Sequence, residues 1–191
     1  MYPDPSEFSQ IRKVSFSSLF KIYNEEMNNI VEIAPKLCLK ALKPTNFEKQ
    51  NVQLVLKIFE ESNMTALNVL QDKLGYPEMF KDTAIFIKHV LAFWQIMDIK
   101  NPTKVKVNSV PFSSIDDDRF LFFSKFVQWL DCWKNLKQNK REGCFSEETL
   151  FALRQTVNTI LELIKSLLTE QNFKYVLTGK FQTDNLEARF G

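Results

Sequence analysis

The chain has 191 residues, of which 45% are hydrophobic and 18 are phenylalanine, and this composition supports one or two packed domains and excludes a disordered chain. The formal net charge is +2, so any contact with nucleic acid has to depend on local basic patches. Three widely spaced cysteines and a single histidine exclude a mixed cysteine–histidine metal cluster and suit a reducing compartment.

Several functional classes lack their signals. The polar start Met1-Tyr-Pro-Asp-Pro5 has no apolar targeting segment, and no apolar run approaches the roughly 20 residues that a membrane helix needs. The four glycines are far apart, which excludes a phosphate-binding loop and a dinucleotide fingerprint. His89 has no partner motif and is interpreted as a packing or surface residue. We therefore expect an intracellular protein without a membrane partner.

The first half of the chain is predicted to be helical after a short lead-in. Residues 1–14 contain two prolines and are expected to be irregular, and a helix is predicted over residues 17–33. A capping box of Thr45 and Glu48 predicts a second helix, whose single apolar stripe ends at Gly75. Its apolar positions share helical spacing: Val52, Val55, Leu56, Phe59, Leu67 and Leu70.

A third helix is predicted from Asp82 to about Ile99, followed by a loop over residues 101–114 that has the option of a short strand. Ser113 or Ser114 followed by Asp116, Asp117 and Asp118 then favours a helix start, because carboxylates stabilise the N-terminal end of a helix dipole. A metal site is the alternative interpretation of these three acids. The helix is expected to continue to about Lys140.

Lysines and an arginine in the last turns of that helix, up to Arg141, are expected at a helix C-terminus, with a nucleic-acid contact as the alternative. Ser146 predicts the start of a long final helix that ends near Asn172. The apolar run Lys174–Phe181 follows and is predicted to be a strand.

Two carboxylates close the chain. Asp184 and Glu187 are three residues apart, so on a helix both lie on one face, about one turn from each other. Metal-dependent nucleases present a carboxylate to Mg²⁺ by such an arrangement, in which a strand and a polar turn lead to paired acids at a helix start. The same spacing also makes a capping box, which requires no chemistry.

The order of residues in this segment also resembles a known family. Leu177–Gly191 resembles the closing segment of P-element-type transposases, relatives of the THAP-domain transposases, which reads roughly leucine, small residues, a variable pair, Asp, two residues, Glu and Phe-Gly. The resemblance implies that Glu187 takes the place of the last acid of the RNase H-like catalytic triad, a catalytic and metal-binding position. It implies that Asp184 lies beside a bound guanine nucleotide.

Two earlier stretches resemble the helical insertion domain of the same transposases. Ala34-Pro-Lys-Leu37 followed by Lys43–Val52 resembles the opening of that domain. Trp94-Gln-Ile-Met-Asp98-Ile-Lys100 lies where the family tends to have aromatic-Asp-x-x-Asn-Ser-Arg. The resemblance implies guanine-nucleotide positions at Trp94, Gln95 and Asp98, in a domain that binds GTP without a phosphate loop.

Two departures from the family change this expectation. Nothing in residues 1–14 resembles the family's two earlier catalytic Asp residues, and Glu187 alone is too few ligands for two-metal phosphoryl transfer. Gln95 replaces an Asp that can accept two hydrogen bonds from the guanine edge, and Asp98 replaces an Asn. We therefore expect neither Mg²⁺ nor GTP to be bound productively.

Together these patterns predict a mainly α fold with three parts: a lead-in over residues 1–14, a GTP-binding-type helical insertion domain over 15–145, and the C-terminal piece of an RNase H-like domain over 146–191, with a short strand and a truncated helix. The expected function is that of a DNA transposase fragment that is not catalytic alone. The resemblance implies DNA as the parent family's partner and a nuclear location. The alternative is a domesticated helical module that binds protein partners or itself, and an independent Mg²⁺ nuclease is disfavoured.

Overall fold

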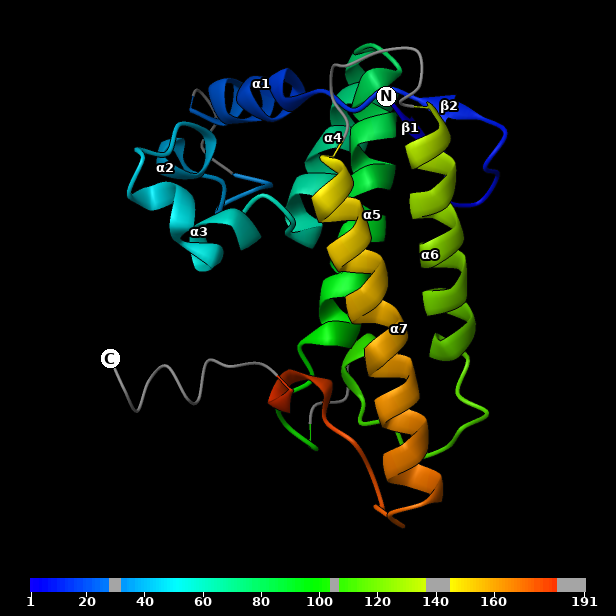
Figure 1. The fold of residues 1–191 in the computed structure, drawn as a ribbon. Coiled ribbons are helices and arrows are strands. Elements are labelled where there is room, and N and C mark those ends of the chain that lie inside the picture. Colours follow the sequence, from blue (N-terminus) through cyan, green and yellow to red (C-terminus); the bar gives the residue numbers. More distant parts are fainter. Residues whose placement is uncertain (28–31, 104–106, 137–144, 182–191) are drawn as a thin grey trace. The chain divides into compact units, whose positions relative to one another are not determined.

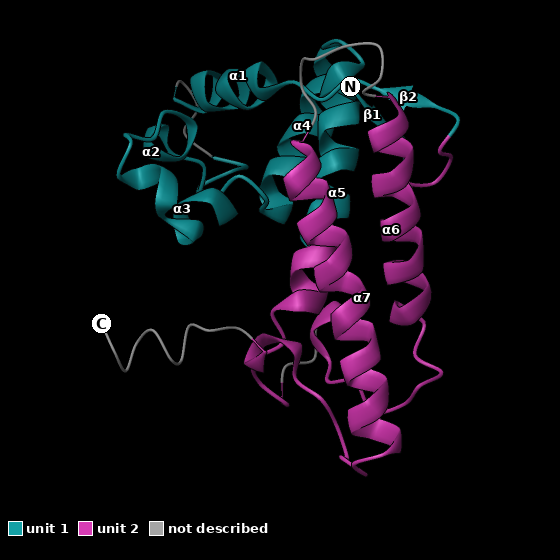
Figure 2. Ribbon diagram, in the orientation of Figure 1, with its two compact units in different colours: residues 1–4, 9–91 teal, residues 5–8, 92–191 magenta. Residues whose placement is uncertain are grey.

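The computed structural model describes residues 1–27, 32–103, 107–136 and 145–181, and this part of the chain is mainly helical, as the sequence predicts. The chain divides into two compact units (Figure 2). Unit 1 holds residues 1–4 and 9–91, and unit 2 holds residues 5–8 and 92–191. The predicted division at residue 145 concerns parts defined by the family resemblance, and it stays a prediction. None of the helices in the described ranges has the length and hydropathy needed to cross a bilayer.

Unit 1 is built from short helices and a two-stranded hairpin (Figure 1). Its elements are β1 (Tyr2–Pro3), β2 (Ile11–Arg12), α1 (Phe16–Glu26), α2 (Leu39–Leu42), the 3₁₀ helix η1 (Glu48–Gln50), α3 (Val52–Leu56), α4 (Glu61–Leu74) and the first part of α5 (Met79–Met97). Helix α1 packs against α4. One core joins them: Leu19, Ile22, Ala34, Leu37, Leu42, Ala66, Leu67, Leu70, Phe80, Ala84 and Ile87.

The lead-in is more ordered than the sequence predicts, because β1 and β2 pair antiparallel, with Tyr2 opposite Arg12. A buried network holds the pair to the first turn of α5. The Tyr2 hydroxyl donates to the Asp82 carbonyl oxygen at 2.5 Å, and the Arg12 guanidinium donates to the carboxylates of Asp4 and Asp82. The sequence signals missed the contacts with Asp82, which lies 70 residues from Arg12 and 80 from Tyr2.

The prediction of one continuous helix over residues 45–75 is wrong, because this range forms three separate helices. Thr45 and Glu48 do form the capping box, with Glu48 N–H donating to Thr45 Oγ1 at 3.3 Å and Thr45 N–H donating to the Glu48 carboxylate at 2.9 Å. The helix nevertheless breaks into η1, α3 and α4. The buried side chain of Asn63 explains the second break, because its amide donates to the carbonyl oxygens of Lys57 and Ile58 at 2.7 and 2.8 Å.

Helix ends in unit 1 follow local rules in part. Gly75 ends α4 in the left-handed conformation, with φ of 66°, as predicted for a C-terminal glycine. Helix α1 ends at Glu26, earlier than the predicted Ile33, and the Glu26 carboxylate accepts hydrogen bonds from the backbone N–H groups of Ile33 and Ala34. Helix α5 begins at Met79, so Asp82 lies in its first turn and is not its N-cap.

Unit 2 consists of the last part of α5, the 3₁₀ helix η2 (Val107–Ser109), α6 (Arg119–Leu136), α7 (Glu147–Thr169) and the 3₁₀ helix η4 (Thr178–Lys180). Helices α6 and α7 pack against each other (Figure 1). Ser146 caps α7 as predicted, since its hydroxyl accepts from Thr149 N–H at 3.2 Å. The predicted end of α6 near Lys140 lies outside the described residues.

Aromatic rings fill the core of unit 2. Phe93 stacks on Phe126 with ring centroids 4.2 Å apart and planes 6° from parallel. Phe126 contacts Trp129, and Trp129 contacts Trp133, at centroid distances of 5.4 and 4.9 Å. Such rings bury large apolar areas in defined orientations, so this row fixes α6 against the last turns of α5.

The predicted strand over residues 174–181 is wrong. A single bridge pairs Val176 with Phe112, and the two residues exchange both backbone hydrogen bonds at 2.8 and 3.0 Å. The chain then turns into η4, where the side chain of Thr178 bonds to α5.

Candidate functional site

Two of the residues singled out by sequence, Trp94 and Gln95, lie in the last turn of α5, and Asp98 directly follows its last residue, Met97. Trp94, Gln95 and Asp98 are each partly buried, and Asp98 N–H donates to the Trp94 carbonyl oxygen at 2.9 Å. The three side chains therefore lie within five residues at the C-terminal end of α5. Asp184 and Glu187 lie outside the described residues.

Two of these side chains are engaged by neighbours within unit 2. Asn108 Nδ2, from η2, donates to Gln95 Oε1 at 3.1 Å. The Lys100 ammonium lies 3.0 Å from an Asp98 carboxylate oxygen. Both acceptor groups are therefore already in contact with a donor of this chain, and a nucleotide would have to compete with these contacts.

The segment after α7 returns to the same end of α5. Thr178 Oγ1 donates to the Ile96 carbonyl oxygen at 2.5 Å and accepts from Ile99 N–H at 3.3 Å. Gly179 N–H donates to the Ile99 carbonyl oxygen at 3.0 Å. Thr178 is 1% exposed, so these bonds are shielded from water. They provide partners for backbone groups at the C-terminal end of α5, where no further helical turn follows to pair with them.

Gly179 is in close contact with this helix end. A Cβ atom at this position would lie 3.1 Å from the carbonyl carbons of Asp98 and Ile99 and 2.7 Å from Lys100 Cγ. Two of these three atoms are backbone and cannot move away cheaply. Glycine is therefore required here by the approach of η4 to α5.

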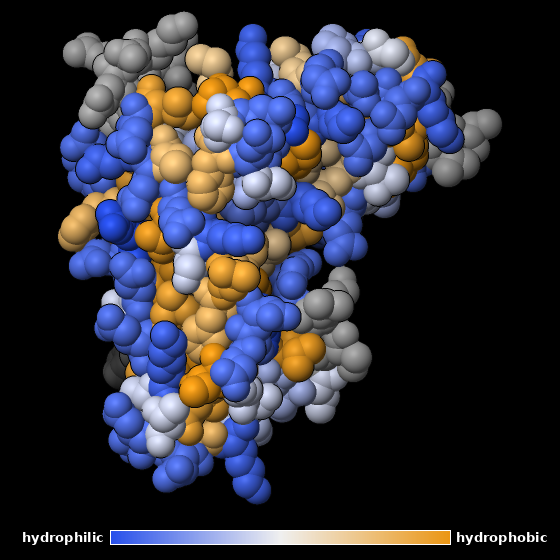
Figure 3. Space-filling view, turned by 90° about the vertical axis from the view of Figure 1, so that its right-hand side faces the viewer, coloured by the Kyte–Doolittle hydropathy of each residue, from blue (hydrophilic) through white to orange (hydrophobic). Residues whose placement is uncertain are grey.

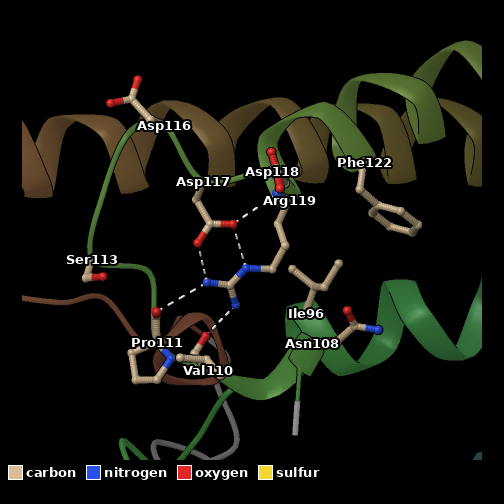
Figure 4. Close-up of a pocket in the computed structure, with 10 residues that line it drawn as sticks. All are labelled: Ile96, Asn108, Val110, Pro111, Ser113, Asp116, Asp117, Asp118, Arg119 and Phe122. Carbon is tan, nitrogen blue, oxygen red and sulfur yellow. Dashed lines mark hydrogen bonds and ion pairs between the residues drawn. The ribbon is translucent and has the colours of Figure 1, made fainter. Parts of the chain in front are cut away.

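A cavity of about 580 Å³ opens beside these residues, between the end of α5 and the loop that leads to α6 (Figure 4). Ile96 and Phe122 contribute apolar surface to it, and Asn108 and Ser113 contribute polar groups. The remaining lining residues are Val110, Pro111, Asp116, Asp117, Asp118 and Arg119. The cavity adjoins the resemblance-derived positions, because Asn108 also bonds to Gln95.

The guanidinium of Arg119 pins the loop to the start of α6. Its Nε and Nη2 atoms donate to the two carboxylate oxygens of Asp117 at 2.8 and 2.6 Å (Figure 4). Nη1 donates to the Val110 carbonyl oxygen, and Nη2 to the Pro111 carbonyl oxygen at 3.2 Å. The group also lies over the Phe112 ring, 3.9 Å from its centroid. Arg119 is thus fully used in holding the loop.

This arrangement determines the charge of the cavity. Burial would raise the pKa of the Asp117 carboxyl, but hydrogen bonds and the positive charge of Arg119 outweigh burial and lower it. Asp117 therefore stays ionised and neutralises the charge of Arg119. Among the described residues that line the cavity, Arg119 is the positively charged one. Asp118 adds negative charge to the lining, and Asp116 adds it nearby although its side chain points away from the cavity, so the cavity does not favour a triphosphate.

The predicted helix start at Ser113 or Ser114, with the three aspartates in its first turn, is wrong, because α6 begins at Arg119 and has no acid in its first turn. The sequence prediction also missed the contacts of Arg119. Asp117 Oδ1 accepts from Arg119 N–H at 2.9 Å, so Asp117 satisfies a backbone donor at the helix start. The signal was an arginine two residues after a helix-capping aspartate. Within the described ranges there is no group of three or more His, Cys, Asp or Glu side chains suited to a metal ion, which leaves the alternative metal site at residues 116–118 without support.

His89 lies in unit 1 on α5, partly buried. Removal from water lowers its pKa to about 4, and the Asp4 carboxylate acts in the opposite direction. Such a histidine stays neutral across physiological pH.

Comparison of the chain with protein-family models, with curated proteins and with solved structures found no match.

Proposed function

We propose that this chain is a helical insertion domain of the kind found in P-element-type DNA transposases, joined to the last part of an RNase H-like domain. One observation carries the proposal: Thr178 and Gly179 make three hydrogen bonds to Ile96, in the last turn of α5, and to Ile99, just after it. Both segments belong to stretches that resemble the family, and 79 residues separate Ile99 from Thr178. Two unrelated chance resemblances would give no reason for these stretches to be in contact.

The proposal includes the loss of tight GTP binding. An Asp at position 95 would offer two acceptor oxygens to the guanine edge, whereas Gln95 offers one, and that oxygen accepts from Asn108 at 3.1 Å. The acidic cavity next to Gln95 further disfavours the phosphates. The altered residues and the local charge support weak or absent nucleotide binding.

Restoring the family pattern tests this assignment. The double variant Gln95→Asp, Asp98→Asn recreates Asp-x-x-Asn, and we expect it to bind a fluorescent GTP analogue at least tenfold more tightly than the unchanged chain does. Gln95→Asn with Asp98→Asn is the matched control, because it removes the same side chains without adding the paired acceptor. An ATP analogue measures guanine selectivity. Equal binding by both double variants would refute the assignment of positions 95 and 98.

The proposal also states that the chain does not cleave DNA alone. The resemblance assigns one triad acid, Glu187, to this polypeptide, and two-metal phosphoryl transfer needs several carboxylates. Incubation with supercoiled plasmid and Mg²⁺ should leave the plasmid intact. Nicking that disappears in Glu187→Gln would contradict this part of the proposal and support an independent nuclease.

A second candidate function is a helical protein-interaction module, which exposed apolar side chains favour. Phe47 is 93% exposed and Phe151 is 67% exposed, and Figure 3 shows apolar side chains gathered in a band on one face between charged ones. Exposed apolar surface of this kind is typical of interaction sites. A defined oligomer or a stable complex, together with failure of the guanine test, would favour this candidate.

A further inference from the structure

The short helix α3 has no buried residue, although four of its five residues are aliphatic in the sequence Val-Gln-Leu-Val-Leu. Val52 is 52% exposed and Val55 is 41% exposed, and their spacing of three residues puts them on one face. The preceding η1 also has no buried residue. Helices in folded proteins normally bury such an apolar stripe against a neighbour. The exposed face of α3 could therefore be buried by a binding partner.

An exposed aromatic ring and several lysines lie close to α3 along the chain. Phe47 directly precedes η1, and its side chain is almost entirely in water. Residues 34–59 contain five lysines and a single acid, Glu48. Lys40, on α2, and Lys49, in η1, are both exposed. Both of these elements pack against α3. Phe47, Val52 and Val55 with these two lysines are called the α3 surface.

The same chain contains a segment of complementary character. Residues 115–121, called the acidic segment, carry Asp116, Asp117 and Asp118 between two exposed aliphatic side chains. Ile115 is 49% exposed and Leu121 is 59% exposed. Asp117 is held by Arg119, but Asp116 and Asp118 are exposed, and Asp116 points away from the cavity (Figure 4).

We propose that the α3 surface of one copy of this chain binds the acidic segment of a second copy. Val52, Val55 and Phe47 would bury apolar area against Ile115 and Leu121, while Lys40 and Lys49 would face Asp116 and Asp118. The two surfaces are different, so the contact is heterologous and joins copies head to tail. This property is independent of nucleotide binding and of DNA chemistry.

Charge and shape together select this occupant over nucleic acid. Phosphates would use the lysines but would leave the two valines in water, and apolar contact is the larger source of affinity at an interface core. The whole chain carries a formal charge of only +2, which gives weak general attraction to DNA. A partner with both carboxylates and aliphatic side chains satisfies both halves of the surface.

Sedimentation of the full chain tests the proposal. In 50 mM salt the weight-average mass should rise above the monomer value of 22.4 kDa as the protein concentration increases towards about 100 µM, the range of a small transient interface. In 500 mM salt the rise should shrink, because screening weakens the charge pairs. A constant monomer mass in low salt would overturn the proposal.

Charge exchange identifies the surfaces. Lys40→Glu with Lys49→Glu should give a monomer, and so should Asp116→Lys with Asp118→Lys. An equimolar mixture of the two variants should associate again, because each reversed surface then meets a reversed partner. Thermal melting of each variant checks that it is folded. Two folded monomeric variants that stay monomeric when mixed would exclude this pairing.

The apolar half has its own variant. Phe47→Ala should weaken self-association at least fivefold and leave the melting temperature unchanged, since the ring is 93% exposed. Phe151→Ala, which removes a 67% exposed ring from α7, is the matched control and should leave association unchanged. Equal effects of the two variants would contradict the assignment. A mobility shift of short duplex DNA that is lost in Lys40→Glu, Lys49→Glu, with no self-association, would assign the lysines to DNA instead.

Discussion

Thr178 Oγ1 donates to the carbonyl oxygen of Ile96 at 2.5 Å, across 82 residues of sequence. This bond and the neighbouring bond from Gly179 N–H to Ile99 close the end of α5 with a segment that follows α7. The positions that resemble a nucleotide site therefore depend on η4 for their support. The first prediction concerns the residue that permits this approach.

Gly179→Ala should destabilise unit 2 by about 2 kcal/mol, because the added Cβ would lie 3.1 Å from two backbone carbons of α5. Denaturant unfolding followed by tryptophan fluorescence measures the effect, since all three tryptophans, Trp94, Trp129 and Trp133, lie in unit 2. Gly75→Ala in unit 1, followed by circular dichroism, is an informative control: nothing lies within 4 Å of its Cβ, but the φ of 66° makes alanine cost about 1 kcal/mol. Unchanged stability in Gly179→Ala would show that η4 is not held against α5.

Arg119→Lys should behave almost like Arg119→Ala, with both losing about 2 kcal/mol of unfolding free energy. The guanidinium makes a two-point contact with Asp117 and reaches two carbonyl oxygens, and a lysine ammonium cannot reproduce that fork. Chemical denaturation compares the three proteins. Full stability in the lysine variant would mean that charge alone, without the fork geometry, holds the loop.

The pH dependence of the same contact has a defined sign. The pKa of Asp117 is lowered in the folded protein by Arg119, although burial opposes this. Its contribution is therefore fully present above the unfolded pKa of about 3.9 and is lost as the pH falls through the lower folded value. The stability difference between the unchanged chain and Asp117→Asn should shrink below about pH 4 in urea unfolding series. A difference that grows on acidification would reverse the assignment.

Local signals predicted much of the fold. Ser146, Gly75 and the Thr45–Glu48 pair each do what their sequence context indicates, because caps depend on residues within one turn. The mainly helical class followed from apolar periodicity for the same reason. These features require no knowledge of distant contacts.

Contacts that reach beyond one helical turn decided the remainder. The stripe from Val52 to Leu70 has helical spacing throughout, but Asn63 is 0% exposed and takes the carbonyl groups of residues 57 and 58, so the chain turns between α3 and α4. Residues 174–181 have strand-like composition, but Phe112 offers only one bridge. Apolar periodicity does not show which residues of other segments a side chain will contact. For the same reason the sequence did not predict the hydrogen bonds from Arg119 to the carbonyl groups of Val110 and Pro111.

His89 should make unit 1 less stable in mild acid. Its pKa is about 4 in the folded protein, below the unfolded value of 6.5, because removal from water disfavours the charged ring. The stability that it contributes is present above about pH 6.5 and is lost as the pH falls towards 4, so unfolding free energy should drop by about 2 kcal/mol between pH 7 and pH 5. His89→Leu should flatten this slope when unfolding is followed by circular dichroism. An unchanged slope would assign the acid sensitivity to other groups.

The last prediction concerns Arg12, whose guanidinium lies between two carboxylates that are almost fully buried. Asp4 is 3% exposed and Asp82 is 8% exposed, and Arg12 Nη1 donates to Asp82 at 2.7 Å. Arg12→Ala should cost about 3 kcal/mol, because it leaves two buried negative charges without their shared cation. Lys36→Ala provides the contrast: its ion pair with Glu60 joins side chains that are 63% and 34% exposed, so its loss should cost less than about 1 kcal/mol. Equal costs in urea unfolding would mean that the hairpin of β1 and β2 does not depend on this charge network.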